Sequence, residues 1–258
     1  MSGRLAFITG ASSGIGQALA LRFHACGDRL ALVARRTDEV RRWAAAAGID
    51  PSRLAVYAAD VRDVEAIVGA GRACIEAQGL PDVVVANAGI SIGMDTAERA
   101  DLDVMRATYE TNNLGMAATF HPFVEAMSQR GSGRLVGIAS VAGIRGLPGH
   151  GAYCASKAAA ISYCESLRGE CAPSGVKVVT LLPGYIDTPL TRGNRYSMPF
   201  LMPVEVFAER AFAAIVAGDS YRVIPWQMGV MAKLLRLLPN AMFDKALSKR
   251  QRKQRQAR

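Results

Sequence analysis

Short runs of apolar residues alternate along most of this chain with longer segments of helical periodicity. Strands that are covered by helices on both faces read as such runs, and Val83-Val84-Val85 is a clear example. The alternation predicts an α/β fold, a doubly wound parallel sheet of about seven strands flanked by helices. The expected strands are Leu5–Thr9, Leu30–Ala34, Leu54–Ala58, Asp82–Ala86, Arg134–Ala139, Val176–Leu182 and Tyr221–Ile224. The expected helices are Ile15–Cys26, Thr37–Ala47 (with Thr37 as N-cap), Val64–Gln78, Leu102–Gln129 and Ala152–Cys171.

The size and composition of the chain predict a single globular domain over residues 1–258. Of its 258 residues, 50% are apolar, which is enough to bury a large core and excludes a disordered chain. The five cysteines form no CxxC pair and show no zinc-ligand spacing, so we expect reduced thiols and no metal site. The first strand leaves no room for a signal peptide, and no apolar run reaches the ~18 residues of a membrane span. These features predict a cytoplasmic protein.

Positive charge is concentrated near the C-terminus. The formal net charge is +9, and the residues from Ala241 onward contain seven Lys or Arg and one Asp. Such a tail could contact an anionic membrane or a nucleic acid, but we favour a solvated chain end and predict no nucleic-acid partner.

A glycine-rich turn, Thr9–Gly16, lies between the first expected strand and its helix. This context is typical of a dinucleotide-binding turn of the Rossmann type, in which backbone N–H groups and a helix N-terminus bind pyrophosphate. Gly10 would permit the tight turn, Gly14 would let the pyrophosphate approach, and Gly16 would let the helix pack on the strand. The expected cofactor-binding residues of the turn are Gly10, Ser12, Ser13, Gly14, Ile15 and Gly16.

The end of the second strand indicates which dinucleotide binds. An NAD site usually has a carboxylate there for the ribose 2′-hydroxyl, whereas this strand ends in Arg35 and Arg36. Guanidinium groups bind a phosphate through charge-assisted hydrogen bonds. We therefore expect NADP(H) rather than NAD, with Arg35 as the principal contact of the 2′-phosphate, Arg36 second, and Ser12 or Ser13 assisting.

Polar residues also follow the third and fourth strands. Asp60-Val61 and Asn87-Ala88-Gly89 are expected at the carboxyl edge of the sheet, where open α/β sheets bind ligands. Asp60 could accept a hydrogen bond from the adenine amino group, and Asn87 could tie neighbouring strands together. Either residue alone is equally typical of a turn.

Tyr153 and Lys157 are four residues apart on one expected helix, and Ser140 lies thirteen residues before the tyrosine. Side chains at i and i+4 share a helical face, with Cβ atoms about 5–6 Å apart. Because an ammonium stabilises a nearby phenolate, we expect Lys157 to lower the pKa of Tyr153 from about 10 toward neutrality. Asn112 or Asn113, inside the long helix where asparagine has poor propensity, is expected to kink the helix and hold a water against the lysine.

Together these motifs resemble the short-chain dehydrogenase/reductase family over about residues 4–190. The matching features are the Thr9–Gly16 turn, Asp60, Asn87-Ala88-Gly89, Asn112 with Gly115, Ser140, Tyr153-x-x-x-Lys157, and Pro183-Gly184 with Thr188. The resemblance implies that Tyr153 is the general acid in carbonyl reduction and the base in alcohol oxidation. It also implies that Ser140 binds the substrate oxygen and that Lys157 holds the nicotinamide ribose.

The resemblance further implies that Asn112 relays protons through water. The family prefers an apolar residue after this asparagine, whereas this chain has Asn113, so the choice between the two stays open. The residues that would line the nicotinamide are Pro183, Gly184, Ile186 and Thr188.

The segments that match the family least are expected to frame the substrate pocket: Ser91–Met94, Val141–His150 and Tyr185–Met202. Their apolar residues suggest an apolar or lipid-like ligand, although such residues more often pack a lid. His150 either reaches the pocket or is a spectator in its loop. Residues 191–225 are expected to hold the substrate lid and the last strand. The apolar residues in question are Met94, Leu147, Tyr185, Met198, Phe200 and Leu201.

Beyond the last strand, Trp226–Leu238 has apolar residues at helical spacing, with Lys233 and Arg236 between them. Together with the basic tail, residues 226–258 resemble a shallow membrane-surface anchor. An amphipathic helix in this position more often closes the core or a subunit contact, and we favour that role.

We therefore predict an NADPH-dependent oxidoreductase that interconverts a carbonyl compound and a secondary or primary alcohol. The expected substrate is a small apolar molecule, and the expected assembly is a homodimer or homotetramer through the long helices. Two alternatives stay open. One is a 3-oxoacyl-carrier-protein reductase. The other is a non-catalytic NADP(H)-sensing protein, against which the intact set of Ser140, Tyr153 and Lys157 argues.

Overall fold

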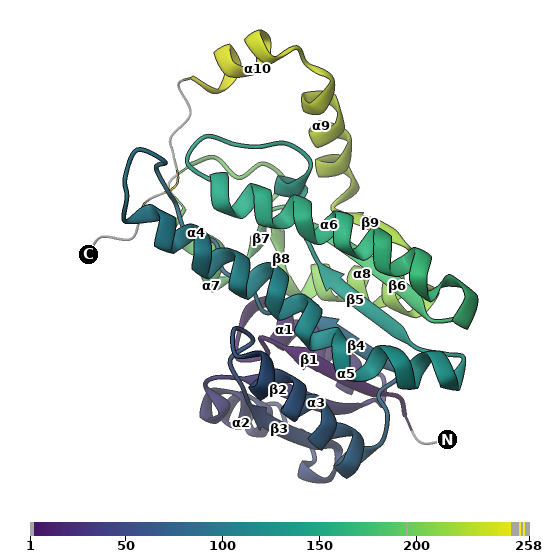
Figure 1. The fold of residues 1–258 in the computed structure, drawn as a ribbon. Coiled ribbons are helices and arrows are strands. Elements are labelled where there is room, and N and C mark those ends of the chain that lie inside the picture. Colours follow the sequence, from purple (N-terminus) through teal and green to yellow (C-terminus); the bar gives the residue numbers. More distant parts are fainter. Residues whose placement is uncertain (1–2, 195, 249–252, 254, 256–258) are drawn as a thin grey trace.

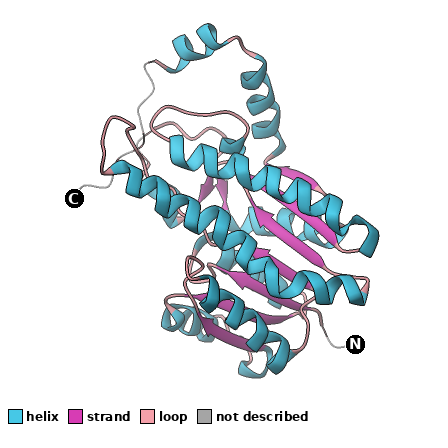
Figure 2. Ribbon diagram, viewed as in Figure 1, coloured by secondary structure: helices cyan, strands magenta, loops and turns pink. Residues whose placement is uncertain are grey.

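The computed structural model describes residues 3–194, 196–248, 253 and 255. Seven strands form one parallel sheet in the order β3-β2-β1-β4-β5-β6-β9 (Figures 1 and 2). The predicted doubly wound sheet of about seven strands is confirmed. The strands are β1 (Leu5–Thr9), β2 (Arg29–Ala34), β3 (Leu54–Ala58), β4 (Val83–Ala86), β5 (Arg134–Ile138), β6 (Lys177–Pro183) and β9 (Tyr221–Ile224).

Helices cover both faces of the sheet and divide its apolar side chains between two cores. Side chains alternate along β1, so Ala6 and Ile8 join one core while Leu5 and Phe7 join the other. The first core is closed by α1 (Gly14–Ala25), α2 (Thr37–Ala46) and α8 (Val204–Ala217). The second is closed by α3 (Val64–Gln78), α5 (Gly115–Arg130) and α6 (Gly151–Cys171).

The expected long helix is present but interrupted. The helix α4 (Asp101–Tyr109) runs through a π-helical turn, Glu110–Leu114, into α5. This turn contains Asn112 and Asn113, so the irregularity lies where asparagine was expected to disturb the helix.

Two local expectations need correction. Thr37 is the first residue of α2 rather than its cap, because the cap position falls on Arg36, which makes no side-chain capping bond. The region expected to hold only a lid and the last strand also contains α8, whose buried Phe207, Ala211 and Ile215 pack against the first core. Smaller elements in this region are β7 (Ile186–Asp187), α7 (Pro189–Arg192) and β8 (Met202–Pro203).

The last two helices stand apart from the sheet. They are α9 (Trp226–Leu237), which confirms the helix expected at Trp226–Leu238, and α10 (Asn240–Leu247). Figure 1 shows them as a yellow arm that projects beyond α6 and β9. Among the described residues, no helix is both long and apolar enough to cross a bilayer.

The sheet order reverses between β1 and β4, because the chain adds β2 and β3 on one side and β4, β5 and β6 on the other. Ligands of open α/β sheets bind at such a switch point, beyond the carboxyl ends of the strands. The polar residues that follow β1, β3, β4 and β5 are therefore brought to one edge.

Candidate active site

A cleft of about 490 Å³ runs along the carboxyl edge of the sheet. Nearly all of the expected cofactor and catalytic residues line it, from the glycine turn at one end to Tyr153 and Lys157 at the other. Among the expected residues, Gly16 and Asn112 lie outside the lining. The expected residues that line the cleft are Gly10, Ser12, Ser13, Gly14, Ile15, Arg35, Arg36, Asp60, Val61, Asn87, Ala88, Gly89, Ser140, Tyr153, Lys157, Pro183, Gly184, Ile186 and Thr188.

The glycine turn has a backbone conformation in which residues with a side chain would be strained. Gly10 and Gly14 have φ angles of +68° and +61°, which lie in the left-handed region. A Cβ on Gly16 would lie 2.4 Å from the Gly10 carbonyl oxygen and 2.5 Å from Asn87 Nδ2, so a side chain at this position would displace the turn. Gly16 is therefore a packing residue beneath the cleft, which agrees with its expected role.

Asn87 ties the ends of β1 and β4 together, the role expected for it. Its Nδ2 donates to the carbonyl oxygens of Thr9 (2.9 Å) and Gly10 (3.3 Å). In the same place, the Thr9 hydroxyl oxygen accepts hydrogen bonds from the backbone N–H groups of Asn87 (3.1 Å) and Ala88 (3.3 Å). These contacts join the floor of the cleft to the glycine turn.

Two arginines line the cleft beside the glycine turn, and their order as contacts of a 2′-phosphate stays a prediction. Arg36 Nη2 lies 3.4 Å from Ser12 Oγ, while Arg35 Nη1 lies 3.7 Å from Asp60 Oδ2. The Asp60 carboxylate also accepts hydrogen bonds from Arg62, which hold the pKa of Asp60 below its usual value. Asp60 thus contacts both Arg35 and Arg62 while it still lines the cleft, so its expected contact with an adenine stays a prediction. Sequence reasoning missed Arg62, although its place two residues after Asp60 was a usable signal.

Ser140, Tyr153 and Lys157 come together where β5 and α6 border the cleft. Lys157 Nζ lies 5.9 Å from the centroid of the Tyr153 ring and donates a 2.7 Å hydrogen bond to the Ile138 carbonyl oxygen. Ser140 Oγ accepts from the Ala142 N–H at 3.1 Å and lies 3.5 Å from the Pro183 carbonyl oxygen. The three side chains approach one another as the spacing predicted.

The expected direction of the Tyr153 pKa is wrong for this structure. Burial raises the pKa of Tyr153 above its ordinary value, and the hydrogen bond with the Ser140 hydroxyl only partly opposes the rise. Burial also lowers the pKa of Lys157 to about 8. The lysine donates to a backbone carbonyl rather than to the phenol, so desolvation outweighs the attraction that the i, i+4 spacing suggested.

The two asparagines of the π-helical turn have different environments. Asn112 is 1% exposed, and its amide exchanges hydrogen bonds with the backbone of Ile90 (2.9 and 3.0 Å) and donates to Ser156 Oγ (2.9 Å). A Cβ on Gly89 would lie 3.2 Å from Asn112 Oδ1 and 3.6 Å from Lys157 Nζ, so both groups border Gly89. Asn113 instead donates to the Ser156 carbonyl oxygen at 2.8 Å. The geometry brings Asn112 toward the lysine.

Comparisons with known proteins identify the family of this chain. Residues 4–198 match the family model of the short chain dehydrogenases. The chain belongs to the short-chain dehydrogenase/reductase family. An uncharacterized oxidoreductase of Myxococcus xanthus is 40% identical over 95% of this chain and 97% of its own length. The enzyme is thus a short-chain dehydrogenase/reductase that acts with a nicotinamide cofactor.

Solved structures of the family share the fold. A short-chain dehydrogenase from Burkholderia cenocepacia in complex with NADP superposes with a TM-score of 0.81 at 26% identity, over 95% of this chain and 98% of that one. A 3-ketoacyl-(acyl-carrier-protein) reductase from Brucella melitensis complexed with NADH gives a TM-score of 0.77 at 26% identity, over 86% of this chain and 96% of that one.

A second cavity, of about 110 Å³, adjoins the cofactor cleft in this short-chain dehydrogenase. The hydroxyl-bearing residues Ser140 and Tyr153 lie at the junction, because they line both spaces. The residues common to both linings are Ser140, Tyr153, Gly184, Leu190 and Thr191.

The predicted pocket residues are only partly correct. Leu147, Tyr185 and His150 line the cavity, and His150 Nε2 lies 3.2 Å from the Tyr196 hydroxyl. Met94 is instead buried against the first turn of α6, where its sulfur lies 3.2 Å from the Ala152 backbone nitrogen. Met198 is not part of the lining. Phe200 and Leu201 also lie outside it, and they are 52% and 47% exposed because the segment before β8 turns outward.

The C-terminal arm supplies the cavity wall that sequence reasoning missed. Four residues of α9, namely Met228, Met231, Ala232 and Leu235, line the cavity, and Phe243 of α10 joins them. The inner face of this helix therefore closes a cavity, whereas the favoured role was to close the core or a subunit contact; neither core includes a described residue of α9.

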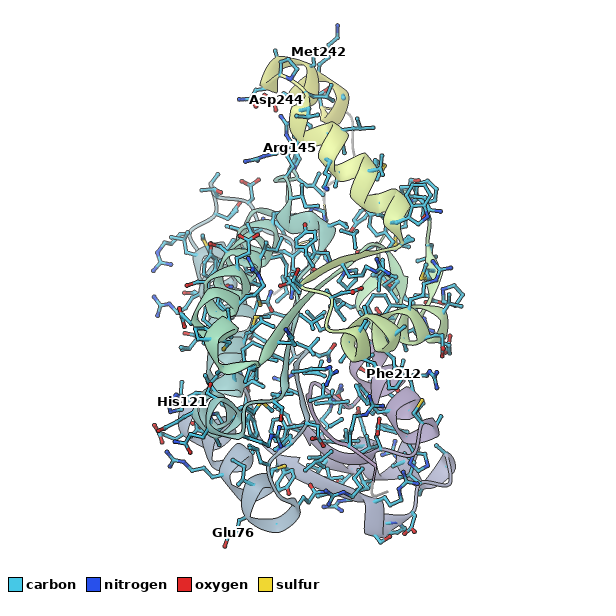
Figure 3. The ribbon with its side chains drawn as sticks, turned by 90° about the vertical axis from the view of Figure 1, so that its right-hand side faces the viewer. Glu76, His121, Arg145, Phe212, Met242 and Asp244 are labelled. Carbon is cyan, nitrogen blue, oxygen red and sulfur yellow. The ribbon has the colours of Figure 1, made fainter. Side chains whose placement is uncertain are left out.

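Arg145 fastens the arm to the loop that follows β5. Its guanidinium donates to the carbonyl oxygens of Leu235 and Leu238, the latter at 2.9 Å, and to Asn240 Oδ1 at 3.1 Å. It also stacks on Phe243, with Cζ 3.7 Å from the ring centroid. Figure 3 shows Arg145 beneath the α10 residues Met242 and Asp244.

Two described residues of the basic tail return to the body. Lys253 Nζ donates to Ser91 Oγ at 2.8 Å beside the cavity. Arg255 Nε pairs with Asp101 Oδ2 at 2.7 Å, and its Nη2 lies 3.6 Å from Glu98 Oε2. These two side chains are therefore bound to the body, which the favoured interpretation of a solvated end did not include, although Arg255 stays exposed. The tail residues 249–252, 254 and 256–258 lie outside the described part of the chain.

Proposed function

We propose that this short-chain dehydrogenase is an NADPH-dependent carbonyl reductase that interconverts an apolar carbonyl compound and its alcohol. The observation that carries the proposal is the place of Ser140 and Tyr153 at the junction of the cofactor cleft and the apolar cavity. A substrate oxygen at that junction can reach both hydroxyls, while its carbon faces the cleft.

The preference for NADP(H) rests on the end of β2. No acidic residue follows this strand directly, and both Arg35 and Arg36 line the cleft with side chains 64% and 62% exposed. The contact of Arg36 with Ser12 brings a guanidinium and a hydroxyl to one point. Such a pair suits a 2′-phosphate better than a ribose hydroxyl.

A reduced nicotinamide, when bound, supplies hydride to the carbonyl carbon. In the mechanism that we propose, the hydroxyls of Ser140 and Tyr153 hydrogen-bond to the carbonyl oxygen and stabilise the developing negative charge. The phenol then donates its proton to that oxygen. Because burial raises the pKa of Tyr153, the phenol is protonated at neutral pH, which is the form that reduction needs.

Lys157 and Asn112 would complete the proton path. The ammonium of Lys157, at its position between Ile138 and Gly89, would hold the nicotinamide ribose. Asn112 would fix the Ile90 segment and a water beside the lysine, as its hydrogen bonds to the Ile90 backbone suggest. We propose Asn112 rather than Asn113 for this role.

The cavity lining favours a neutral or anionic substrate over a cationic one. Its walls are mainly aliphatic and aromatic, and its basic side chains are Arg145 and Lys253, the latter with a pKa lowered by burial. No Asp or Glu is among the described residues that line it. An amine substrate would meet only like charges there, whereas an apolar ketone or aldehyde would meet the methionines and Leu235.

The two other functions fit less well. A 3-oxoacyl-carrier-protein reductase must admit a long phosphopantetheine arm. Here residues of α9 and α10 close one side of a cavity of only about 110 Å³. A non-catalytic sensor of NADP(H) would not need a proton donor between a cofactor cleft and a second cavity.

We further infer that the enzyme assembles as a homodimer or homotetramer through its long helices. Leu102 and Leu114 support this inference, because they are 43% and 49% exposed along the α4–α5 helix. Light scattering after size-exclusion chromatography measures the mass of the assembly.

A screen of NADPH consumption tests the proposed function. The purified enzyme is offered hydrophobic ketones and aldehydes together with acetoacetyl thioesters, and absorbance at the NADPH band is followed. We expect consumption with apolar carbonyls and little with the thioesters. Tight NADPH binding without consumption across the whole panel would support the sensor instead.

A further inference from the structure

The outer face of the C-terminal arm carries a stripe of exposed apolar side chains. Trp226, Val230, Leu234 and Leu237 follow one another at spacings of four, four and three residues, so they share one face of α9. Their exposed fractions are 66%, 48%, 60% and 80%, and Met242 of α10 adds a side chain that is 59% exposed. These five residues are the apolar stripe.

This stripe is not the face that closes the substrate cavity. The cavity is lined by Met228, Met231 and Leu235, which lie on the other side of the same helix. The helix α9 therefore has two apolar faces. One lines the cavity, and the other is exposed. Soluble monomers rarely expose a continuous apolar patch without a partner for it.

The arm that presents the stripe is anchored. Arg145 bonds to the last carbonyls of α9 and to Asn240, and it stacks on Phe243. Figures 1 and 3 show α9 and α10 projecting from the body of the protein, with the α10 residue Met242 at the outermost end. The stripe therefore lies on an arm that is both held to the body and projects from it.

Charge around the stripe indicates which partner it fits. Lys233 and Arg236 are exposed between the apolar residues, and Lys245 is exposed on α10. Asp244 is the single acidic residue from Trp226 to Ser248. Beyond Lys245, the sequence contains six more Lys or Arg. Basic residues interleaved with Trp and Leu are typical of helices that lie on anionic lipid. Lysine is depleted from the centres of protein–protein interfaces, which disfavours a second copy of the chain.

We propose that the apolar stripe of α9 and α10 binds the surface of anionic membranes. The apolar side chains would enter the boundary between headgroups and acyl chains, while Lys233 and Arg236 would contact lipid phosphates. The substrate cavity would then lie one helix thickness, about 10 Å, from the lipid.

Flotation with vesicles tests this proposal on the full-length protein. The vesicles contain either phosphatidylcholine alone or equal parts of phosphatidylcholine and phosphatidylglycerol. We expect flotation with the mixed vesicles and much less with phosphatidylcholine alone. The double variant Leu234→Ser/Leu237→Ser should weaken binding to the mixed vesicles at least about tenfold, because it removes two inserted side chains. Lys233→Gln should weaken it about fivefold, and added salt should have the same effect.

A matched control is available on the body of the protein. Val206 of α8 is 40% exposed, and Val206→Ser should leave flotation unchanged. NADPH binding, followed by fluorescence, should be the same in every variant, which shows that the cofactor site is folded. This readout does not depend on the reaction that we propose.

Either of two results would overturn the proposal: equal flotation of the wild type and the Leu234→Ser/Leu237→Ser variant, or no flotation of the wild type with the mixed vesicles. In the second case, a lower mass of the double variant in analytical ultracentrifugation would make the stripe a contact between subunits.

Discussion

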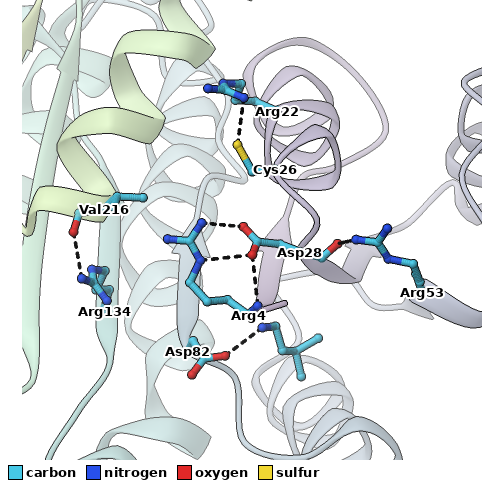
Figure 4. Close-up of polar contacts among 9 residues, drawn as sticks. Arg4, Arg22, Cys26, Asp28, Arg53, Asp82, Arg134 and Val216 are labelled. Atoms are coloured by element: carbon cyan, nitrogen blue, oxygen red, sulfur yellow. Dashed lines mark hydrogen bonds and ion pairs between the residues drawn. The ribbon is translucent and has the colours of Figure 1, made fainter. Parts of the chain in front are cut away.

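The two edges of the central sheet treat their charged residues in opposite ways. At the amino edge, Figure 4 shows a set of closed contacts among residues that precede or begin the strands. Asp28 is 2% exposed and accepts three hydrogen bonds from Arg4, from its backbone N–H and its guanidinium (2.9–3.1 Å). Nearby, Asp82 accepts from the Leu5 N–H at 2.8 Å, and Arg134 donates to the Val216 carbonyl oxygen at 2.8 Å.

At the carboxyl edge the polar groups face a cleft. Arg35 and Arg36 are more than half exposed, and Ser140 and Tyr153 line two adjoining spaces. Burial shifts the pKa values of Tyr153 and Lys157 in opposite directions, each toward its neutral form. Perturbed groups of this kind gather at functional sites.

From this contrast we infer that similar residue types stabilise the fold at one edge and, in the function that we propose, carry the chemistry at the other. A substitution at the amino edge should change the free energy of unfolding but spare turnover. A substitution at the carboxyl edge should lower turnover but leave the free energy of unfolding nearly unchanged.

The largest effect is expected for Tyr153→Phe. Because the variant lacks the proton donor, turnover should fall by about 10²–10⁴-fold while NADPH still binds and the melting temperature changes little. Steady-state kinetics and fluorescence titration measure both quantities. Tyr163→Phe is the matched control, since Tyr163 lies on the same helix but packs against Phe120 in the core. Unchanged turnover in Tyr153→Phe would refute the role of the phenol.

The amino edge is tested by Asp28→Ala. The change leaves the Arg4 guanidinium without its carboxylate, so the free energy of unfolding should fall by about 1.5–3 kcal/mol. Denaturation with urea measures the loss, and kcat of the folded variant should match the wild type. Asp103→Ala, which breaks the exposed pair with Arg99, should cost less than about 1 kcal/mol. Equal losses in both variants would remove the distinction between closed and exposed pairs.

The cofactor preference is tested by Arg35→Ala and Arg36→Ala. Losing a charge-assisted contact with a 2′-phosphate should weaken NADPH binding by about tenfold to a hundredfold and leave NADH binding nearly unchanged. Calorimetry on both variants with both cofactors ranks the two arginines. If NADPH and NADH weakened equally, neither residue would contact a 2′-phosphate.

The pH dependence should separate activity from stability at Lys157. Its ammonium is lost as the pH rises through about 8, so kcat/KM for NADPH should fall above that pH. The unfolded chain binds more protons than the folded one between the folded value of about 8 and the ordinary 10.5, so this group makes the free energy of unfolding rise across the same window. Lys157→Met should have a low kcat/KM that does not fall further above this pH. If kcat/KM of Lys157→Met still fell there, the titrating group would be another one.

Much of the fold and of the cofactor cleft could be predicted because their signals are local. The run Leu5–Thr9 reads as a strand because both of its faces are covered, and Asn87 follows β4 at the edge where any parallel strand would place it. Tyr153 and Lys157 share a helical face at any i, i+4 spacing.

The remaining features depend on contacts between distant segments. The pKa of Tyr153 depends on desolvation and on the direction of Lys157, which the spacing alone does not define. Asp60 lies at the cleft as expected, but the spacing did not show that Arg62 would contact its carboxylate. Met231 and Phe243 form part of the cavity wall. The sequence of this region indicates an amphipathic helix, but it does not show what the inner face of that helix covers.

The most direct test of the account is the fate of deuterium at C4 of the nicotinamide. NADPH labelled on either face of C4 is incubated with the enzyme and a carbonyl compound that the screen selects, and the alcohol is analysed by mass spectrometry. We expect one deuterium on the carbinol carbon from one labelled face, and a rate in Tyr153→Phe lower by about 10²–10⁴-fold. Loss of NADPH absorbance with no deuterium in the alcohol would contradict it.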